Sequence, residues 1–121
     1  MGTWSYGNFD NDCSADFLSE LTGNIVSEIR EAIKEPSDLE ADEYWGSAMP
    51  ACIEILNLLS SQKWVGVTLP EESEAKIWKD IFLKVWGESI DALEPKEGHK
   101  EKRLSVLENT FNKLIESTQH S

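Results

Sequence analysis

A chain of 121 residues and 13.7 kDa has room for one domain with one hydrophobic core, which excludes a two-domain enzyme. Its composition, 40% hydrophobic with five tryptophans, is that of a folded globule rather than of an acidic disordered tail. Twenty-three acidic residues against eleven basic ones give a net charge of −12, which repels phosphate backbones and anionic lipid. We therefore expect neither a nucleic-acid binder nor a membrane binder.

Residues 1–11 are predicted to form an aromatic loop that packs on the body of the protein, because glycines and aromatic residues occur there without a helical period. Trp4 and Phe9 are the expected anchors. The loop ends in N-cap residues for a helix that starts near Cys13, and Asp16 fits the same helix because acids are favourable near a helix N-terminus. The expected capping residues are Asp10, Asn11 and Asp12.

The next two stretches carry apolar residues at helical spacing. Phe17, Leu18 and Leu21 give the first helix its apolar face, and Gly23-Asn24 is expected to break or bend it. A second amphipathic helix is predicted from Ile25 to Ile33, with Pro36 as its end.

An acidic connector is predicted at about residues 36–46. The stretch from Glu35 to Gln62 holds six acids and no Lys or Arg, so its carboxylates repel one another unless a cationic partner is present. Solvated surface is the alternative interpretation. The connector contains an aromatic pair, Tyr44 and Trp45, which either forms a protein-binding hot spot or attaches the connector to the bundle. The candidate partner-binding residues are Glu35, Asp38, Glu40, Asp42, Glu43, Tyr44 and Trp45.

Three further features complete the helical prediction. Ser47 is expected to cap a helix with Pro50 in its first turn, and the apolar run 48–59 predicts that the other helices surround this one. Thr68-x-x-Glu71 predicts a capping box for a helix that turns Trp78 and Trp86 toward the core. After Pro95 and Gly98, apolar residues from Leu104 to Thr118 predict a last helix. The fold class is an all-α, single-domain bundle of four to five helices over residues 1–121.

No pattern for metal or cofactor chemistry is found. Counting a calcium loop from Asp10 places Ala15 where glycine is required, and Cys13 and Cys52 lack zinc-site spacing to each other or to His99 and His120. We expect both cysteines to be reduced and to serve in packing, which favours a cytoplasmic protein. The lack of a signal-peptide or membrane-spanning pattern favours the same location.

An enzyme is not expected, because the chain contains no nucleophile elbow, phosphate-binding loop or dinucleotide fingerprint. Glu54 lies in the most apolar helix, a setting that would suit acid-base chemistry. It falls on the same helical face as Asn57 and Ser61, so a polar strip is the alternative. An enzyme with a carboxylate site at Asp10, Asp12, Asp16 or Glu54 remains a third hypothesis.

The run from Met1 to Asp12, Met-Gly-Thr-Trp-Ser-Tyr-Gly-Asn-Phe-Asp-Asn-Asp, is followed by Ala15-Asp16-Phe17 and Glu20-Leu21. It resembles a bacterial family of uncharacterised small helical proteins whose members open Met-Gly-x-Trp-Gly-x-Gly-x-Phe-Asp-Asn-Asp. Ser5 departs from the usual glycine. The resemblance implies a helical fold and a bacterial or phage origin, and it implies no activity.

The first functional hypothesis is an acidic, non-enzymatic protein that neutralises a basic protein partner, as an immunity protein or antitoxin against a nuclease-type toxin does. Three observations favour this hypothesis: the acidic charge is concentrated in one part of the sequence, aromatic residues lie within that part, and no catalytic pattern is found. The second is a nucleic-acid mimic that regulates a host nucleic-acid-binding protein. A neighbouring toxin gene would favour the first hypothesis over the second.

Overall fold

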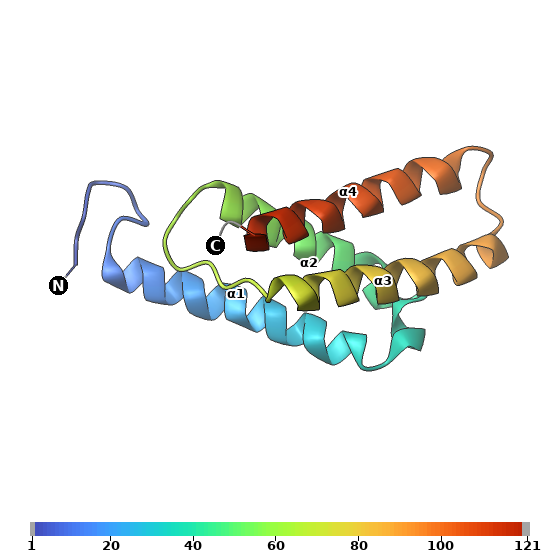
Figure 1. Cartoon of the computed structure of the whole chain (residues 1–121), viewed down its shortest axis with the longest axis horizontal. Coiled ribbons are helices and arrows are strands. Elements are labelled where there is room, and N and C mark those ends of the chain that lie inside the picture. The colour runs from blue at the N-terminus through green and yellow to red at the C-terminus, as the bar shows by residue number, and fades with distance from the viewer. Residues whose placement is uncertain (1, 120–121) are drawn as a thin grey trace.

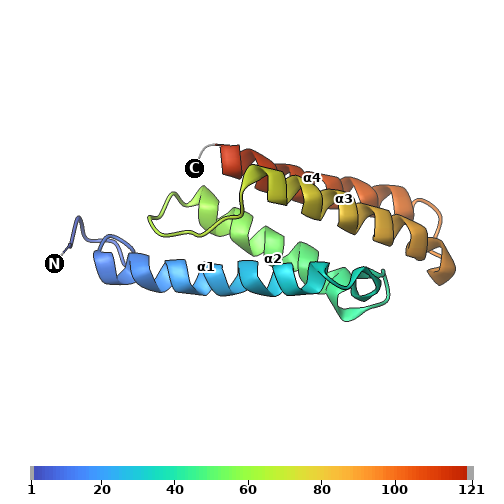
Figure 2. The same ribbon diagram turned by 60° about the horizontal axis from the view of Figure 1, so that its bottom comes forward.

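The computed structural model describes residues 2–119. The predicted domain begins at Met1 and ends at Ser121, and the predicted N-terminal motif also begins at Met1. Residues Met1, His120 and Ser121 lie outside the described residues. Four α-helices, α1 (Asp12–Ile33), α2 (Tyr44–Ser61), α3 (Glu72–Ser89) and α4 (His99–Gln119), run roughly along the long axis of the molecule (Figures 1 and 2). Two short 3₁₀ helices, η1 (Pro36–Leu39) and η2 (Ile90–Leu93), lie in the connections. The predicted all-α single-domain bundle is confirmed.

The core is built by all four helices, with α4 packed against α2 and α3, and α1 against α2, η1 and α3. Each helix turns one apolar stripe inward, and Phe82 of α3 meets Phe111 of α4 with ring centroids 5.4 Å apart. Trp78 and Trp86 are buried as expected. The buried core residues are Val26, Ile29, Ala32, Leu39, Met49, Ile53, Leu56, Ala75, Trp78, Phe82, Trp86, Ile90, Leu107, Phe111 and Leu114.

Helix α1 is continuous through Gly23-Asn24, so the predicted break is wrong. The buried side chains Leu18, Thr22, Val26 and Ile29 follow one another at spacings of four, four and three, so the inward stripe stays in phase across the glycine. A helical glycine costs only about 1 kcal/mol relative to alanine, which continued packing offsets.

Helix α2 begins at Tyr44, three residues before the predicted cap Ser47. Pro50 is therefore its seventh residue rather than part of the first turn, and the missing N–H leaves the carbonyl of Gly46 without its usual partner in the helix. The other helices do not surround α2 completely either, because Leu58 is 59% exposed and Ile55 is also exposed.

Thr68 does not form the predicted capping box. Glu71 is the N-cap of α3 and makes no side-chain capping hydrogen bond. Thr68 instead ties the α2–α3 connection to α1: its backbone N–H donates to Thr22 Oγ1 (2.8 Å) and its hydroxyl donates to the carbonyl of Ser19 (3.1 Å).

Gly66 is the residue at which this connection touches α1. Its φ is +111°, and a Cβ there would overlap the backbone carbonyl of Ala15. We expect Gly66→Ala to lower the free energy of unfolding by about 2–4 kcal/mol, because it adds both backbone strain and a clash. Gly87→Ala in α3 is the matched control: a Cβ there meets nothing within 4 Å, so a gain of about 0.5–1 kcal/mol is expected. Urea unfolding of both variants measures the difference, and equal stabilities would contradict the close contact.

Candidate functional site

The acidic connector is a short, well-anchored segment that ends at Glu43, so Tyr44 and Trp45 belong to the first turn of α2. Leu39 is buried in the core, and the backbone N–H of Ala41 donates to Ser89 Oγ (2.9 Å). The turn closes where the N–H of Glu43 donates to the carbonyl of Glu40 (2.9 Å). A Cβ on buried Gly46 would overlap that same carbonyl, so the turn lies directly against α2.

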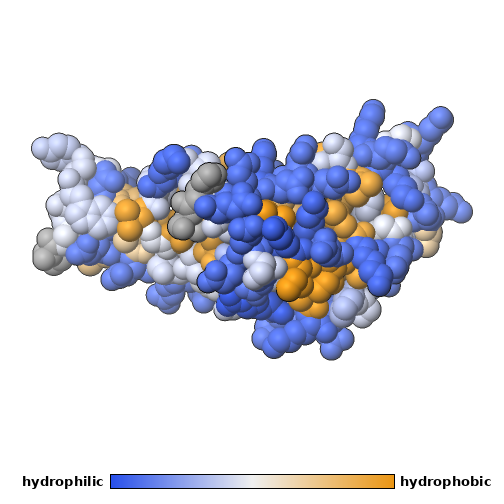
Figure 3. All heavy atoms as spheres, viewed as in Figure 1, coloured by the Kyte–Doolittle hydropathy of each residue, from blue (hydrophilic) through white to orange (hydrophobic). Residues whose placement is uncertain are grey.

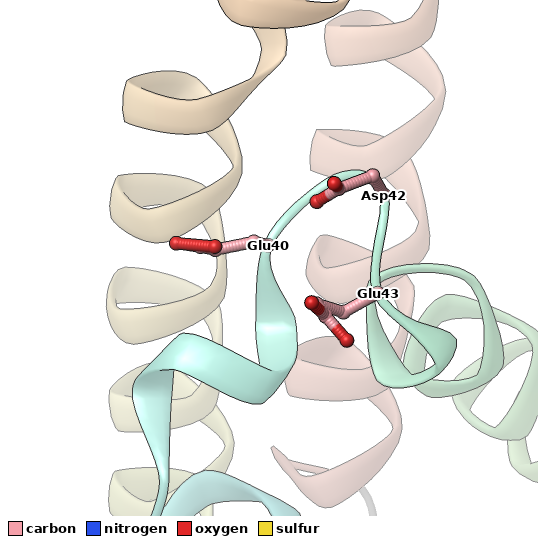
Figure 4. Close-up of side chains that lie close together, drawn as sticks. All are labelled: Glu40, Asp42 and Glu43. Carbon is pink, nitrogen blue, oxygen red and sulfur yellow. The ribbon is translucent and has the colours of Figure 1, made fainter.

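This turn brings three carboxylates together. Oxygens of Glu40, Asp42 and Glu43 lie within 4.8 Å of one another, and Figure 4 shows all three side chains on the one turn before α2. Within the part of the chain that the structure describes, no salt bridge involves these three residues, Glu35 or Asp38. Oxygen ligands of this kind suit Ca²⁺ or Mg²⁺, which need about six, and they equally suit an ammonium or guanidinium group.

A shallow cavity of about 380 Å³ lies on one side of the connector and is floored in part by Trp45. Asp38 lines it from the connector, and α1 contributes Glu28 and Glu31. Glu31 pairs with Lys34 (3.0 Å). Glu28 and Glu31 were not predicted, because their sequence positions give no sign that α1 packs beside Trp45.

A second cavity, of about 330 Å³, lies between the acidic turn and α3. Glu40 and Asp42 line it together with Glu88, which was not predicted either. Val85 and the exposed Leu93 give it an apolar part. Acidic groups from α1, the connector and α3 therefore adjoin two hollows. We call the predicted residues Glu35, Asp38, Glu40, Asp42, Glu43, Tyr44 and Trp45, together with Glu28, Glu31 and Glu88, the acidic face.

The two aromatic residues of this face have different roles. Trp45 is half-buried against the core, so it attaches the start of α2 to the bundle. Tyr44 is 77% exposed and forms a T-shaped pair with Trp45, with ring centroids 5.7 Å apart. The structure thus uses one ring as an anchor and leaves the other at the surface.

The predicted N-terminal motif is a folded loop, held by both backbone and side-chain hydrogen bonds. Asn11 is the N-cap of α1: its Oδ1 accepts from the N–H of Ser14 (2.8 Å), while Asp10 Oδ2 accepts from the N–H of Gly7 (2.9 Å). The N–H of Asp12 donates to the carbonyl of Gly2 (2.6 Å), so Asp12 closes the loop through its backbone.

Phe9 is the aromatic anchor of this loop, stacked on Trp64 with ring centroids 4.1 Å apart. The other expected anchor, Trp4, is 48% exposed. Of the two, only Phe9 makes a ring contact with the α2–α3 connection. Asp16 is exposed on α1.

The carboxylates of the enzyme hypothesis lie apart. Asp10, Asp12 and Asp16 are at the N-terminal end of α1, whereas Glu54 is exposed on α2. Glu54 lines a groove between α2 and α4 with Asn57 and Ser61, as expected for a polar strip. The Asn57 side-chain amide donates to the carbonyl of Thr110 (3.0 Å).

The chain matches the family described as "Domain of unknown function (DUF4259)" over residues 2–119. It belongs to this family. No curated protein and no solved structure matches the chain. Among residues 2–119 of this family member, every helix is too short or too polar to cross a membrane.

The two free cysteines provide a chemical test of the α1–α2 packing in this family member. Cys13 is exposed and Cys52 half-buried. Burial raises the pKa of the Cys52 thiol, and the negative charge of Glu28 raises it further. A raised pKa leaves less reactive thiolate, so we expect iodoacetamide at pH 8 to modify Cys13 about tenfold faster than Cys52.

Glu28→Gln should accelerate modification of Cys52 and leave the rate at Cys13 unchanged, because it removes only the charge beside Cys52. Peptide mass spectrometry at successive times measures both rates. Equal rates at the two cysteines, or no response to Glu28→Gln, would contradict the placement of Glu28 beside α2.

Proposed function

We propose that this protein is a non-enzymatic binding protein that neutralises a basic protein partner. The observation that supports the proposal is the acidic face: carboxylates from the connector are unpaired with cations within residues 2–119, lie beside an exposed tyrosine, and are joined by Glu28 and Glu88. Gathering like charges without counter-ions lowers stability, so a cationic ligand that relieves this repulsion gains free energy on binding.

A nuclease-type toxin is the partner class that we favour, with this protein acting as its immunity protein or antitoxin in the bacterial cytoplasm. Nucleases present cationic surfaces that follow the phosphate backbone, and an acidic face competes for the same surface. Such charge-steered pairs associate rapidly and weaken as salt rises.

The test begins with affinity capture from the native host on two columns, one carrying the unsubstituted protein and one the triple variant Glu40→Lys, Asp42→Lys, Glu43→Lys. We expect a basic protein that only the first column retains at 50 mM NaCl and releases at 500 mM NaCl. Expressing that protein should arrest growth, and coexpression of the unsubstituted chain, but not of the variant, should restore it.

Two results would count against the proposal. Full protection by the triple variant would show that the acidic face is not used, and retention of the same proteins by both columns would show that the capture is not specific to it. Capture of a non-toxic nucleic-acid-binding protein of the host would instead support a nucleic-acid mimic.

A further inference from the structure

One side of α1 continues the acidic face toward the N-terminus. Phe17, Leu21, Asn24, Glu28 and Glu31 follow one another at spacings of four, three, four and three, so they lie in one row along the helix. The last two line the cavity beside Trp45. At 1.5 Å per residue the row is about 21 Å long from Phe17 to Glu31. It is apolar at one end and acidic at the other.

The apolar end of this row is not used by the core. Phe17 is 60% and Leu21 43% exposed, while their neighbours Leu18 and Thr22 are buried. Figures 1 and 2 both show α2 diverging from α1 toward the C-terminal end of α2. The N-terminal half of α1 is instead contacted by the α2–α3 connection, at Gly66 and Thr68.

On α1 itself the charge around this end is of one sign, while the α2–α3 connection carries one cation, Lys63. The first cation of the sequence after Gly2 is Arg30, and Asp16 and Glu20 lie exposed next to Phe17 and Leu21. Figure 3 shows a different apolar patch, between the C-terminal part of α1 and α3. Arg30 of α1 pairs with Glu74 of α3 (2.8 Å). Two copies of this chain joined through Phe17 and Leu21 would bring acids against acids, whereas a basic partner would meet opposite charge.

We infer that this row of α1 receives an amphipathic basic helix of the partner protein, with apolar side chains on Phe17 and Leu21 and Lys or Arg on Glu28 and Asp38. The inference rests on the proposed function and extends its binding surface. Within residues 2–119 the only β pairing is the bridge between Thr3 and Asn11, so the structure offers no strand edge for an extended peptide. A row of about 21 Å matches about 14 residues, or four turns, of a partner helix.

The test uses two synthetic, fluorescein-labelled peptides of 18 residues made from leucine, lysine and alanine. The first has leucines at helical spacing at one end and lysines on the same face over the remaining turns. The second has the same composition in an order that gives no helical face. Fluorescence anisotropy at 50 mM NaCl should show the first binding about tenfold more tightly, since only it places its apolar residues together.

The double variant Phe17→Ser, Leu21→Ser should bind the first peptide about tenfold more weakly, since it removes the apolar contact. The matched control is Leu58→Ser, Val106→Ser, which alters side chains of similar exposure in the α2–α4 groove and should change affinity less than about twofold. All four positions are exposed, so thermal unfolding is expected to show both variants folded.

The inference is overturned if the first peptide does not bind, if both peptides bind equally, if the Phe17 and Leu21 variant binds as well as the unsubstituted protein, or if the groove control loses the binding. The proposed function fails separately. If the Glu40, Asp42 and Glu43 reversal abolishes binding of the first peptide while the Phe17 and Leu21 variant does not, the acidic face stands without this extension. If the reversal leaves capture and protection intact, the function itself is wrong.

Discussion

Reversing Glu40, Asp42 and Glu43 to lysine should slow association with the basic partner at least tenfold at 50 mM NaCl. Each reversal changes the charge by two, so the net charge goes from −12 to −6, and the change is concentrated where three carboxylates lie within 4.8 Å. Electrostatic steering raises association rates by about 10- to 1,000-fold and weakens over a Debye length of about 10 Å at 0.1 M salt. The difference between variant and unsubstituted protein should therefore shrink at 500 mM NaCl, as stopped-flow measurements at both salt concentrations would show.

The matched control for this charge reversal is the triple variant Glu97→Lys, Glu101→Lys, Glu108→Lys. It has the same net charge, but its three exposed positions lie in α4 and the segment before it. A contribution from total charge alone would slow both variants equally, and that result would contradict a localised binding face. The neutral variant Glu40→Gln, Asp42→Asn, Glu43→Gln should fall between the reversal and the unsubstituted protein.

The largest stability effect is expected for Phe82→Ala, which should lower the free energy of unfolding by about 3–5 kcal/mol. Phe82 is fully buried between helices and its ring faces that of Phe111, so truncation removes apolar contact and leaves a cavity at the α3–α4 contact. A domain of this size is typically stable by about 5–15 kcal/mol, so the variant would be marginally folded.

Ile77→Ala is the internal control for Phe82→Ala because it alters the same helix at a side chain that is 54% exposed. Its effect should stay within about 0.5 kcal/mol. Urea denaturation monitored by circular dichroism compares the two variants. A loss below 1 kcal/mol for Phe82→Ala would mean that α3 and α4 do not pack as described.

The helices that sequence predicts best are those whose apolar spacing is long and regular. The stripes through Trp78, Trp86 and Leu107 belong to such helices, and their burial follows from periodicity alone. The predictions that are wrong concern residues whose role depends on tertiary contacts. Gly23 is typical of a helix break, but the buried residues on both sides of it lie on the same face of α1, so the helix continues. Thr68 fits the pattern of a helix cap, but its hydrogen bonds go to α1.

The acidic face was predictable only in part, for a related reason. Its connector residues are consecutive in sequence, so their charge is visible by counting. Glu28 and Glu88 join it through the packing of α1 and α3 beside the connector, which no local pattern encodes. The start of α2 at Tyr44 was missed because Glu43 caps it without a side-chain hydrogen bond, leaving no Ser or Thr signal at that position.

The anchoring of the acidic turn determines how much order binding must create. Leu39 is buried on one side of the turn, the Ala41 N–H is bonded to Ser89 in its middle, and Gly46 lies close against Glu40 on the other side, so the backbone that carries the carboxylates is already held in place. A partner that binds them loses little free energy to fixing the backbone, which is the usual advantage of a preorganised surface. Encounter should then lead directly to the final complex, and the association kinetics should follow a single exponential.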